Sequence, residues 1–210
     1  MRKLILKMQI TVDGFVGGPN GELDWMFTTM SDDLAKWIVE GIGQAGVHIM
    51  GSRTFHDMAA HWPTSSEPFA PPMNDIPKVV FSKDPNVKSR GATATTGALE
   101  SARRAAGTAR TPGRYESWRD ARVATGDLTA EIARLKREPG GDIIAHGGAS
   151  FARSLVRLGL IDEYDLVVHP GALGRGLGLF ADLAAPLALT LVHSTRFSGG
   201  AVANVYEPKR

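Results

Sequence analysis

Apolar and polar residues alternate along the first stretch of the chain. Between residues 4 and 12 every even-numbered position is apolar, while Lys7, Gln9 and Thr11 occupy odd-numbered positions. A period of two residues predicts a half-buried β-strand. Further strands are predicted at apolar runs over residues 47–50, 78–82, 121–125, 142–146 and 160–169, and a hairpin is predicted at 187–197 and 201–206. We therefore expect a sheet that opens at the N-terminus and closes with an antiparallel tail.

Helical periodicity separates the predicted strands. Apolar residues spaced three or four apart follow Ser31, Asp127 and Gly148. This spacing predicts three helices, with Ser31 and Asp127 as N-caps of the first two. Residues 70–76 contain Pro71 and Pro72 and are expected to be irregular. Because strands and helices alternate, the pattern predicts an α/β fold with a mostly parallel sheet.

Residues 86–117 interrupt the alternation. This segment is rich in Ala, Thr, Gly, Arg and Ser and has few large apolar side chains, so it can bury little surface. Residues 99–106 could form a short helix. We expect one domain over residues 1–210, with a flexible insertion at about 86–117.

Composition and charge exclude several classes of protein. The 24 basic and 22 acidic residues give a formal charge of +2, which is too balanced for a nucleic-acid-binding surface. The chain has no cysteine, so disulfides and thiolate metal sites are excluded. Six histidines are scattered without the spacing of metal ligands. The N-terminal apolar run is too short and polar for a signal peptide or membrane span, so we expect a cytoplasmic protein.

A double glycine follows the predicted strand at 142–146. Gly147 and Gly148 lead from this strand into a helix, whose N-terminus presents unpaired backbone N–H groups and a partial positive charge. Without side chains, the two glycines would let an anion such as phosphate approach closely. A tight turn with no ligand is an equally good interpretation of a bare Gly-Gly.

Two other predicted strands also end in small polar or cationic residues. Gly51 to Thr54 follow the strand at 47–50, and Ser82 with Lys83 follows the strand at 78–82. Arg53 could bind a phosphate through its forked guanidinium group, with hydroxyls from Ser52 and Thr54. The alternative is an ordinary helix start with a solvated arginine.

Two further regions carry candidate substrate-side residues. The loop from Asp13 to Gly21 is rich in glycine and leads to Trp25, so it could be a mobile lid or a surface turn with a packed tryptophan. Asp32 and Asp33 lie in the first turn of the helix after Ser31. There they complement the helix dipole, which is the commoner role of acidic residues at that position.

Taken together, these motifs resemble the dihydrofolate reductase-like superfamily. The resemblance rests on segments 50–55, 79–82, 146–150, 160–165 and 170–176, together with Asp13-Gly14 after the first strand. Within the superfamily, the chain is similar to the reductase domain of bacterial bifunctional riboflavin-synthesis deaminase-reductases, in a stand-alone form. The resemblance implies a three-layer fold with a mostly parallel central sheet and an antiparallel C-terminal strand. It also implies a homodimer.

The resemblance further implies that NADPH lies along the strand ends. The pyrophosphate would lie on the double-glycine turn, the adenosine side on the turn after residue 50, and the 2′-phosphate beside the end of the strand at 78–82. Three such sites suit one extended dinucleotide better than three separate anions. The implied cofactor-binding residues are Gly51, Ser52, Arg53, Thr54, Ser82, Lys83, Gly147, Gly148, Ala149, Ser150 and Phe151.

The implied chemistry is hydride transfer to a small pterin-like or aminopyrimidine-like heterocycle. Asp33, or its neighbour Asp32, matches the acidic residue that assists protonation in dihydrofolate reductases. Asp13 and Trp25 would lie on the substrate side. A helix N-terminus lowers the pKa of a carboxyl group, so Asp33 can donate a proton only if it is buried beside an apolar ring; a solvated Asp33 would be a cap or a substrate-binding anion.

Other classes of function fit the sequence less well. The sequence has no catalytic motif of a serine hydrolase, because Ser150 is not in a nucleophile elbow and no motif links it to a histidine. The fused zinc deaminase domain of the riboflavin enzymes is absent from the sequence, as are the cysteines it would need. The alternative that stays open is a non-catalytic NADP(H)-binding module that keeps the fold without the chemistry.

Overall fold

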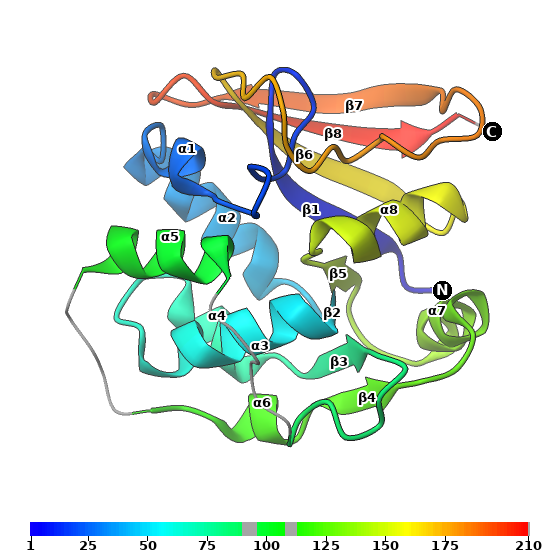
Figure 1. The fold of residues 1–210 in the computed structure, drawn as a ribbon. Coiled ribbons are helices and arrows are strands. Elements are labelled where there is room, and N and C mark those ends of the chain that lie inside the picture. Colours follow the sequence, from blue (N-terminus) through cyan, green and yellow to red (C-terminus); the bar gives the residue numbers. More distant parts are fainter. Residues whose placement is uncertain (90–95, 108–112, 210) are drawn as a thin grey trace.

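The computed structural model describes residues 1–89, 96–107 and 113–209. Its centre is a sheet of eight strands, in the order β4-β3-β2-β5-β1-β6-β8-β7 among the described residues (Figure 1). The strands are β1 (Leu4–Thr11), β2 (Val47–Gly51), β3 (Lys78–Phe81), β4 (Arg122–Ala124), β5 (Ile143–Ala145), β6 (Glu163–His169), β7 (Leu189–Arg196) and β8 (Val202–Pro208). Strands β1 to β6 pair in parallel, and β8 is antiparallel to both β6 and β7. The predicted fold class is confirmed.

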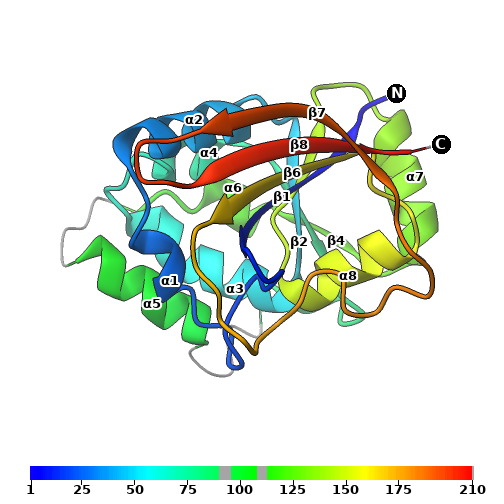
Figure 2. The ribbon, with the colours of Figure 1, turned by 90° about the horizontal axis from the view of Figure 1, so that it is seen from above.

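Helices cover both faces of the sheet (Figure 2). Helices α7 (Leu128–Arg137) and α8 (Ala149–Arg157) pack one face, where Leu135 and Leu155 join Leu4 and Leu6 of β1 in the largest apolar cluster. Helix α2 (Asp32–Gly43) packs the other face through Leu34. The remaining helices are α1 (Asp24–Phe27), α3 (Ser52–His61), α4 (Ala70–Asp75), α5 (Gly97–Ala106) and α6 (Glu116–Arg119), with a 3-10 turn at Trp62–Thr64. The result is three layers, with side chains filling both interfaces.

The predicted caps differ in how they act. The carboxylate of Asp127 accepts a hydrogen bond from the backbone N–H of Ala130 at 2.9 Å, as an N-cap should. Ser31 occupies the N-cap position of α2, but its hydroxyl donates to the carboxylate of Asp33 instead. The position of this helix start was therefore predicted correctly. The prediction that the Ser31 side chain caps the backbone was wrong, because its hydroxyl makes no cap hydrogen bond.

The prediction for residues 70–76 was wrong. They form helix α4, with Pro71 and Pro72 in its first turn. The N–H groups of a first turn have no partner within the helix, so a proline loses nothing there. The start of β6 was also predicted too early. Leu160 donates its backbone N–H to Leu155 of α8, so it belongs to the end of that helix, and β6 begins at Glu163.

Part of the predicted insertion is an ordered helix. Residues 97–106 form α5, which packs against α3 and α1 and buries Leu99 and Ser101. The carboxylate of Asp24 in α1 accepts hydrogen bonds from Ser101 and from Arg104. Residues 90–95 and 108–112 of the same segment lie outside the described residues. The flexibility expected of the whole insertion stays a prediction.

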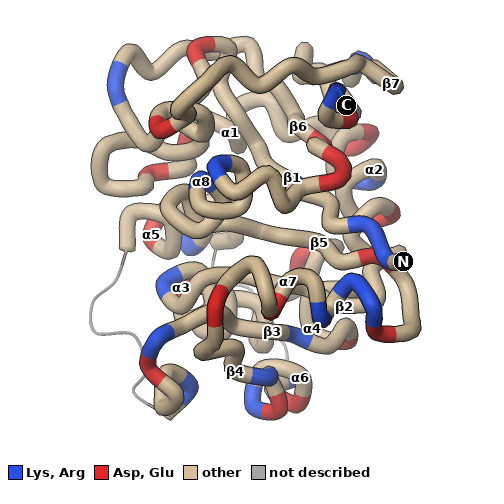
Figure 3. Tube along the Cα trace, turned by 90° about the vertical axis from the view of Figure 1, so that its right-hand side faces the viewer, with Lys and Arg blue, Asp and Glu red and all other residues tan. Residues whose placement is uncertain are grey.

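Charge is spread evenly over the molecule. Figure 3 shows acidic and basic positions interspersed along the trace rather than separated onto different elements. None of the helices in the described ranges is both long and apolar enough to cross a membrane.

Candidate nucleotide and substrate site

Three of the predicted anion-binding turns lie side by side. They follow β3, β2 and β5, which are neighbours in the sheet and run parallel, so their carboxyl ends meet at one edge. The turns after β2 and β5 are joined directly, because the backbone N–H of Gly51 donates to the carbonyl of Gly147 at 3.1 Å. The sequence prediction that these turns form one site is consistent with this arrangement.

Two helices begin at this edge. Gly51 is the N-cap of α3 and Gly148 is the N-cap of α8, and no side chain of the described residues caps either helix. The first N–H groups of both helices therefore remain available to an outside acceptor. The partial positive charges of the two helix starts add at the same place, which favours an anion.

The glycines at these starts are required by close packing. A Cβ atom on Gly148 would lie 2.8 Å from Oγ1 of Thr54, and a Cβ on Gly51 would lie 3.2 Å from the Cβ of Phe151. Gly147 has a φ of +87°, and its peptide bond to Gly148 is cis. Larger residues here would block the approach to the N–H groups.

Aromatic rings extend the site toward β3. Phe151 of α8 packs on Phe81 at the end of β3, with 5.0 Å between the ring centroids. Ala149 and Ser150 form the start of α8, with Ser150 exposed. Ser52 and Arg53 occupy the corresponding positions on α3, and Arg53 is exposed.

Ser82 and Lys83 lie at the end of β3, but both have local partners. The backbone N–H of Ser82 donates to Ala124 at 3.1 Å, and its hydroxyl accepts from the N–H of Asp84 at 3.1 Å. The ammonium group of Lys83 donates to the carbonyls of Thr125 and Gly126. These bonds hold the ammonium group of Lys83 against the residues that directly follow β4. An ammonium group has three donors, so one is left for an anion.

Asp33 is held by four hydrogen-bond donors. Its carboxylate accepts from the hydroxyl of Ser31, the N–H of Leu34 at 2.9 Å, and both the N–H and the hydroxyl of Ser198 at 2.8 and 2.9 Å. The bond from Ser31 and then those from Ser198 lower the pKa of Asp33 to about 2. Asp33 is exposed, as is Asp32. The geometry matches the cap that the sequence left open as an alternative, rather than a proton donor buried beside a ring.

Asp13 connects two loops. Its carboxylate accepts from the hydroxyl of Thr11 at 2.5 Å and from the backbone N–H groups of Leu173 and Gly174 at 3.0 and 2.7 Å. These bonds, that from Thr11 first, lower the pKa of Asp13. The loop after Asp13 also pairs with residues 177–179 through backbone hydrogen bonds. Of the two interpretations of this loop, its contacts favour a packed turn.

Trp25 lies over a buried histidine that the sequence interpretation did not single out. His169, at the end of β6, is 1% exposed, and its ring meets that of Trp25 edge-on with 5.3 Å between centroids. Its Nε2 is 2.6 Å from Oε1 of Gln9, and its Nδ1 is 2.6 Å from the hydroxyl of Thr29. Burial lowers the pKa of His169 to about 4, so the ring is neutral at pH 7.

Strand β1 explains why Gln9 is accessible. On one side β1 pairs with β6 from Ile5 to Thr11, but on the other it pairs with β5 only from Leu4 to Leu6. Beyond Leu6, β1 no longer pairs with β5, and Gln9 lies past the end of β5. Ligands of open α/β sheets bind outside the carboxyl ends of the strands, and β5 ends on that side.

Other titratable groups that the sequence interpretation did not single out lie in or next to the central strands. The ring of His146 lies 4.5 Å from that of His48, and burial keeps the pKa of His146 well below its ordinary value. Lys7 of β1 forms a buried ion pair with Asp165 of β6, and its ammonium lies 4.5 Å from the ring centroid of Trp37. The alternation of residues 4–12 puts Lys7 on the polar side of the predicted strand. It gave no indication that Asp165 would be its partner.

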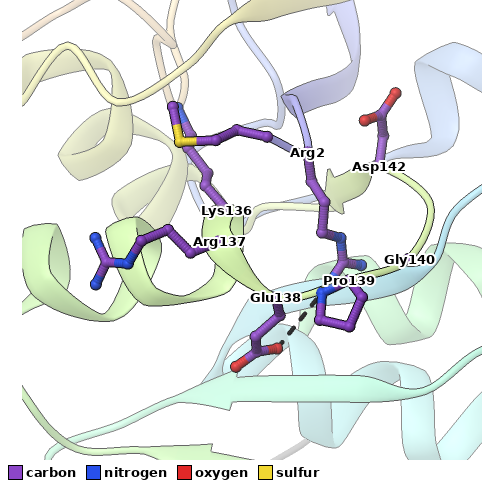
Figure 4. A pocket seen from close by; sticks show the side chains of 8 residues that line it. Arg2, Lys136, Arg137, Glu138, Pro139, Gly140 and Asp142 are labelled. Atoms are coloured by element: carbon purple, nitrogen blue, oxygen red, sulfur yellow. Dashed lines mark ion pairs between the residues drawn. The ribbon is translucent and has the colours of Figure 1, made fainter.

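A hollow of about 450 Å³ lies at the opposite edge of the sheet, near the amino ends of the strands (Figure 4). Its wall includes Arg2, Lys136 and Glu138. Arg2 pairs with Glu138 at 4.0 Å and Lys136 pairs with Asp162 at 2.6 Å, so these cations already have partners. The hollow is separate from the predicted nucleotide edge. The described residues include no group of three or more potential ligands that could hold a metal ion.

Comparisons with known proteins identify the class and then the family. The fold is shared with dihydrofolate reductase from Enterococcus faecalis complexed with NADP(H), at a TM-score of 0.58 and 12% identity, with 99% of this chain and 97% of that chain covered. This is the dihydrofolate reductase-like fold. Residues 2–203 match the RibD C-terminal domain, and the chain belongs to that family.

One relative and one solved structure match this chain over at least 98% of its length. YyaP of Bacillus subtilis (strain 168), an uncharacterized protein, is 30% identical over 205 residues, which cover 98% of this chain and 94% of YyaP. A putative riboflavin biosynthesis protein from Shewanella sp. PV-4 is 22% identical, with a TM-score of 0.68 and complete coverage of both chains. The expected stand-alone form of the reductase domain therefore has counterparts of the same length.

Proposed function

We propose that the protein is an NADPH-dependent reductase that transfers hydride to a small pterin-like or aminopyrimidine-like heterocycle. The observation that carries the proposal is the meeting of two uncapped helix starts, α3 and α8, at adjoining glycine turns. Such a pair suits the pyrophosphate of a dinucleotide. Membership of the RibD C-terminal domain family supports a reductase.

The chain's residues would divide the cofactor among three turns. Gly147, Gly148, Ala149, Ser150 and Phe151 would hold the pyrophosphate, Gly51, Ser52, Arg53 and Thr54 the adenosine side, and Ser82 with Lys83 the 2′-phosphate. A 2′-phosphate is a dianion, so cationic donors near it would favour NADPH over NADH. Bound NADPH would supply the hydride, while the protein orients the rings and excludes water.

Asp33 enters the proposal as a structural anion. With a pKa of about 2, it is ionised at neutral pH and has no proton to donate. Its two bonds from Ser198 hold the start of α2 against the turn between β7 and β8. Replacing Asp33 by asparagine tests this assignment, because a proton donor would be needed for turnover and an anchor would not.

Titration with NADPH tests the nucleotide site. Wild-type protein should bind NADPH, and Gly148→Ala should weaken binding at least about tenfold, because the added Cβ would contact Thr54 and narrow the approach. Gly171→Ala is the matched control: a Cβ there meets nothing within 4 Å, so its NADPH affinity should stay within about twofold of wild type. Failure of the wild type to bind NADPH would refute the proposal.

A turnover assay distinguishes a reductase from a non-catalytic NADP(H)-binding module. Loss of reduced-nicotinamide absorbance should be followed with dihydrofolate, dihydropterins, aminopyrimidines and flavins as acceptors. Oxidation of NADPH by a pterin or aminopyrimidine supports the reductase. Tight binding without turnover of any acceptor supports the alternative, a non-catalytic NADP(H)-binding module.

The proposal includes a cytoplasmic homodimer. Strand β7 is an edge of the sheet, and Leu191 and Val192 on it are 54% and 57% exposed. Unpaired strand edges with apolar residues readily pair with another strand, and a second copy of β7 would give a two-fold symmetric contact. A protein without cysteine is compatible with a reducing compartment.

A further inference from the structure

Gln9, Thr29 and His169 form a polar group that is not among the residues proposed to bind the nucleotide. Both ring nitrogens of His169 have partners, Oε1 of Gln9 on one side and the hydroxyl of Thr29 on the other. With Oε1 of Gln9 as its partner, Nε2 of the neutral ring carries the proton and donates it, because a carbonyl oxygen only accepts hydrogen bonds. The other nitrogen, Nδ1, then accepts from Thr29.

This arrangement fixes the side-chain amide of Gln9. Its carbonyl end is occupied by His169, which is itself buried and covered by Trp25. Among the described residues, no group accepts a hydrogen bond from Nε2 of Gln9. A half-buried amide that is held in this way directs its two N–H donors toward an incoming molecule.

The free donors lie where the substrate ring would lie. Gln9 lies past the end of β5, where β1 pairs with β6 and no longer with β5, and Trp25 of α1 contacts the ring of His169, the partner of Gln9. A donor in a half-buried site discriminates strongly, because a ligand that presents another donor leaves both groups unpaired.

We propose that Gln9 is a specificity-determining residue that recognises a carbonyl oxygen or unprotonated ring nitrogen of the substrate heterocycle, and that His169 is the residue that positions it. This inference rests on the proposed function and narrows its substrate class. The site selects oxo-substituted heterocycles over their amino-substituted counterparts.

Two matched pairs of ligands test the selection. Pterin is compared with 2,4-diaminopteridine, and 5,6-diaminouracil with 2,4,5,6-tetraaminopyrimidine, by tryptophan fluorescence in the presence of NADPH. Wild-type protein should bind at least one oxo compound at least about tenfold more tightly than its amino partner. Equal binding of the partners, stronger binding of the amino compound, or no binding of either oxo compound overturns the inference.

Variants assign the selection to the residues. Gln9→Met should remove the preference, and Gln9→Glu, which replaces donors by acceptors, should shift it toward the amino compounds. His169→Phe frees the amide to rotate and should reduce the preference to within about threefold. His193→Phe, at an exposed histidine of β7, is the control and should keep the wild-type preference. A preference that survives in Gln9→Met overturns the inference.

Two further measurements keep these outcomes distinct. The affinity for NADPH, measured in parallel, should stay within about threefold of wild type in every variant; loss of NADPH binding by wild type itself would instead refute the proposed function. Nitrogen NMR of the wild-type ring should show His169 protonated at Nε2 and not at Nδ1 at pH 7. Protonation at Nδ1 would reverse the amide of Gln9 and overturn the assignment, whether or not the variants fold.

Discussion

The buried ion pair between Lys7 and Asp165 gives the sharpest test of how the sheet is stabilised. The side chains are 13% and 6% exposed, and no described residue pairs with the second carboxylate oxygen of Asp165. Asp165→Asn keeps the shape of the side chain and removes its charge. The ammonium group of Lys7 is then left buried without an anion.

Burial disfavours the charged form of the lysine. It lowers the pKa of Lys7 from its ordinary 10.5 to about 8 even in the wild-type fold, where Asp165 is in place. Removing one partner of a buried pair typically costs about 3–5 kcal/mol. We therefore expect Asp165→Asn to lower the free energy of unfolding by about 3 kcal/mol at pH 7.

The loss should depend on pH in one direction. In wild type the folded-state pKa of Lys7 is about 8, and loss of the Asp165 carboxylate lowers it further, so below about pH 8 the folded wild type binds more protons than the folded variant. The stability of the variant relative to wild type should therefore rise as the pH approaches 8 and then stay level, because above that pH the lysine is neutral in both folded proteins.

Urea unfolding at pH 7 and pH 9.5 measures both effects. Asp182→Asn is the control, because its ion pair with Arg153 lies at the surface and should contribute no more than about 1 kcal/mol. The double variant Lys7→Met with Asp165→Asn removes both charges and should recover most of the loss. A loss below about 1 kcal/mol for Asp165→Asn, or one that does not shrink at pH 9.5, would refute the reasoning.

Three further predictions concern the core, the anchor and the dimer. Leu155→Ala, at a fully buried position on the inner face of α8, should lower the free energy of unfolding by about 2–5 kcal/mol in urea titrations. Asp33→Asn should leave kcat for NADPH oxidation within about threefold of the wild-type value. The pKa of Asp33 is lowered in the fold, so wild type should lose stability as the pH falls from about 4 toward 2, and the variant should not show this loss. A hundredfold loss of kcat would make it catalytic. Val192→Lys on the edge strand should give a monomer by size-exclusion chromatography with light scattering, whereas Leu158→Lys, at an exposed residue after α8, should remain a dimer.

The sequence predicted those parts of the fold that depend on local pattern. The period of two residues at 4–12 and the apolar run at 142–146 both correspond to strands, because alternation and burial are visible within a few residues. Gly51 and Gly148 were predicted to begin helices for a similar reason: both follow a strand directly. Helix α4 was missed because proline is unfavourable inside a helix but harmless in its first turn.

The contacts within the site could not be predicted in the same way. Ser198 binds Asp33 across 165 positions, and Gln9 meets His169 across 160. Contacts between residues so far apart in the sequence cannot be inferred from patterns of a few neighbouring residues. His169 directly precedes a glycine-rich loop at a strand end, which was the one signal that could have drawn notice to it among six histidines.

Helix α5 bears on how a protein of this kind can change its substrate during evolution. The hydroxyl of Ser101 accepts the backbone N–H of Leu23, and Arg104 binds Asp24, so this helix supports the segment that carries Trp25. Yet α5 belongs to the connection between β3 and β4, at the far end of the sheet from β6. Insertions or deletions in that connection can change the support of Trp25, and with it the proposed substrate site, while the strand register and the proposed nucleotide-binding turns stay as they are. Descendants of one reductase could in this way acquire new substrates without rebuilding the fold.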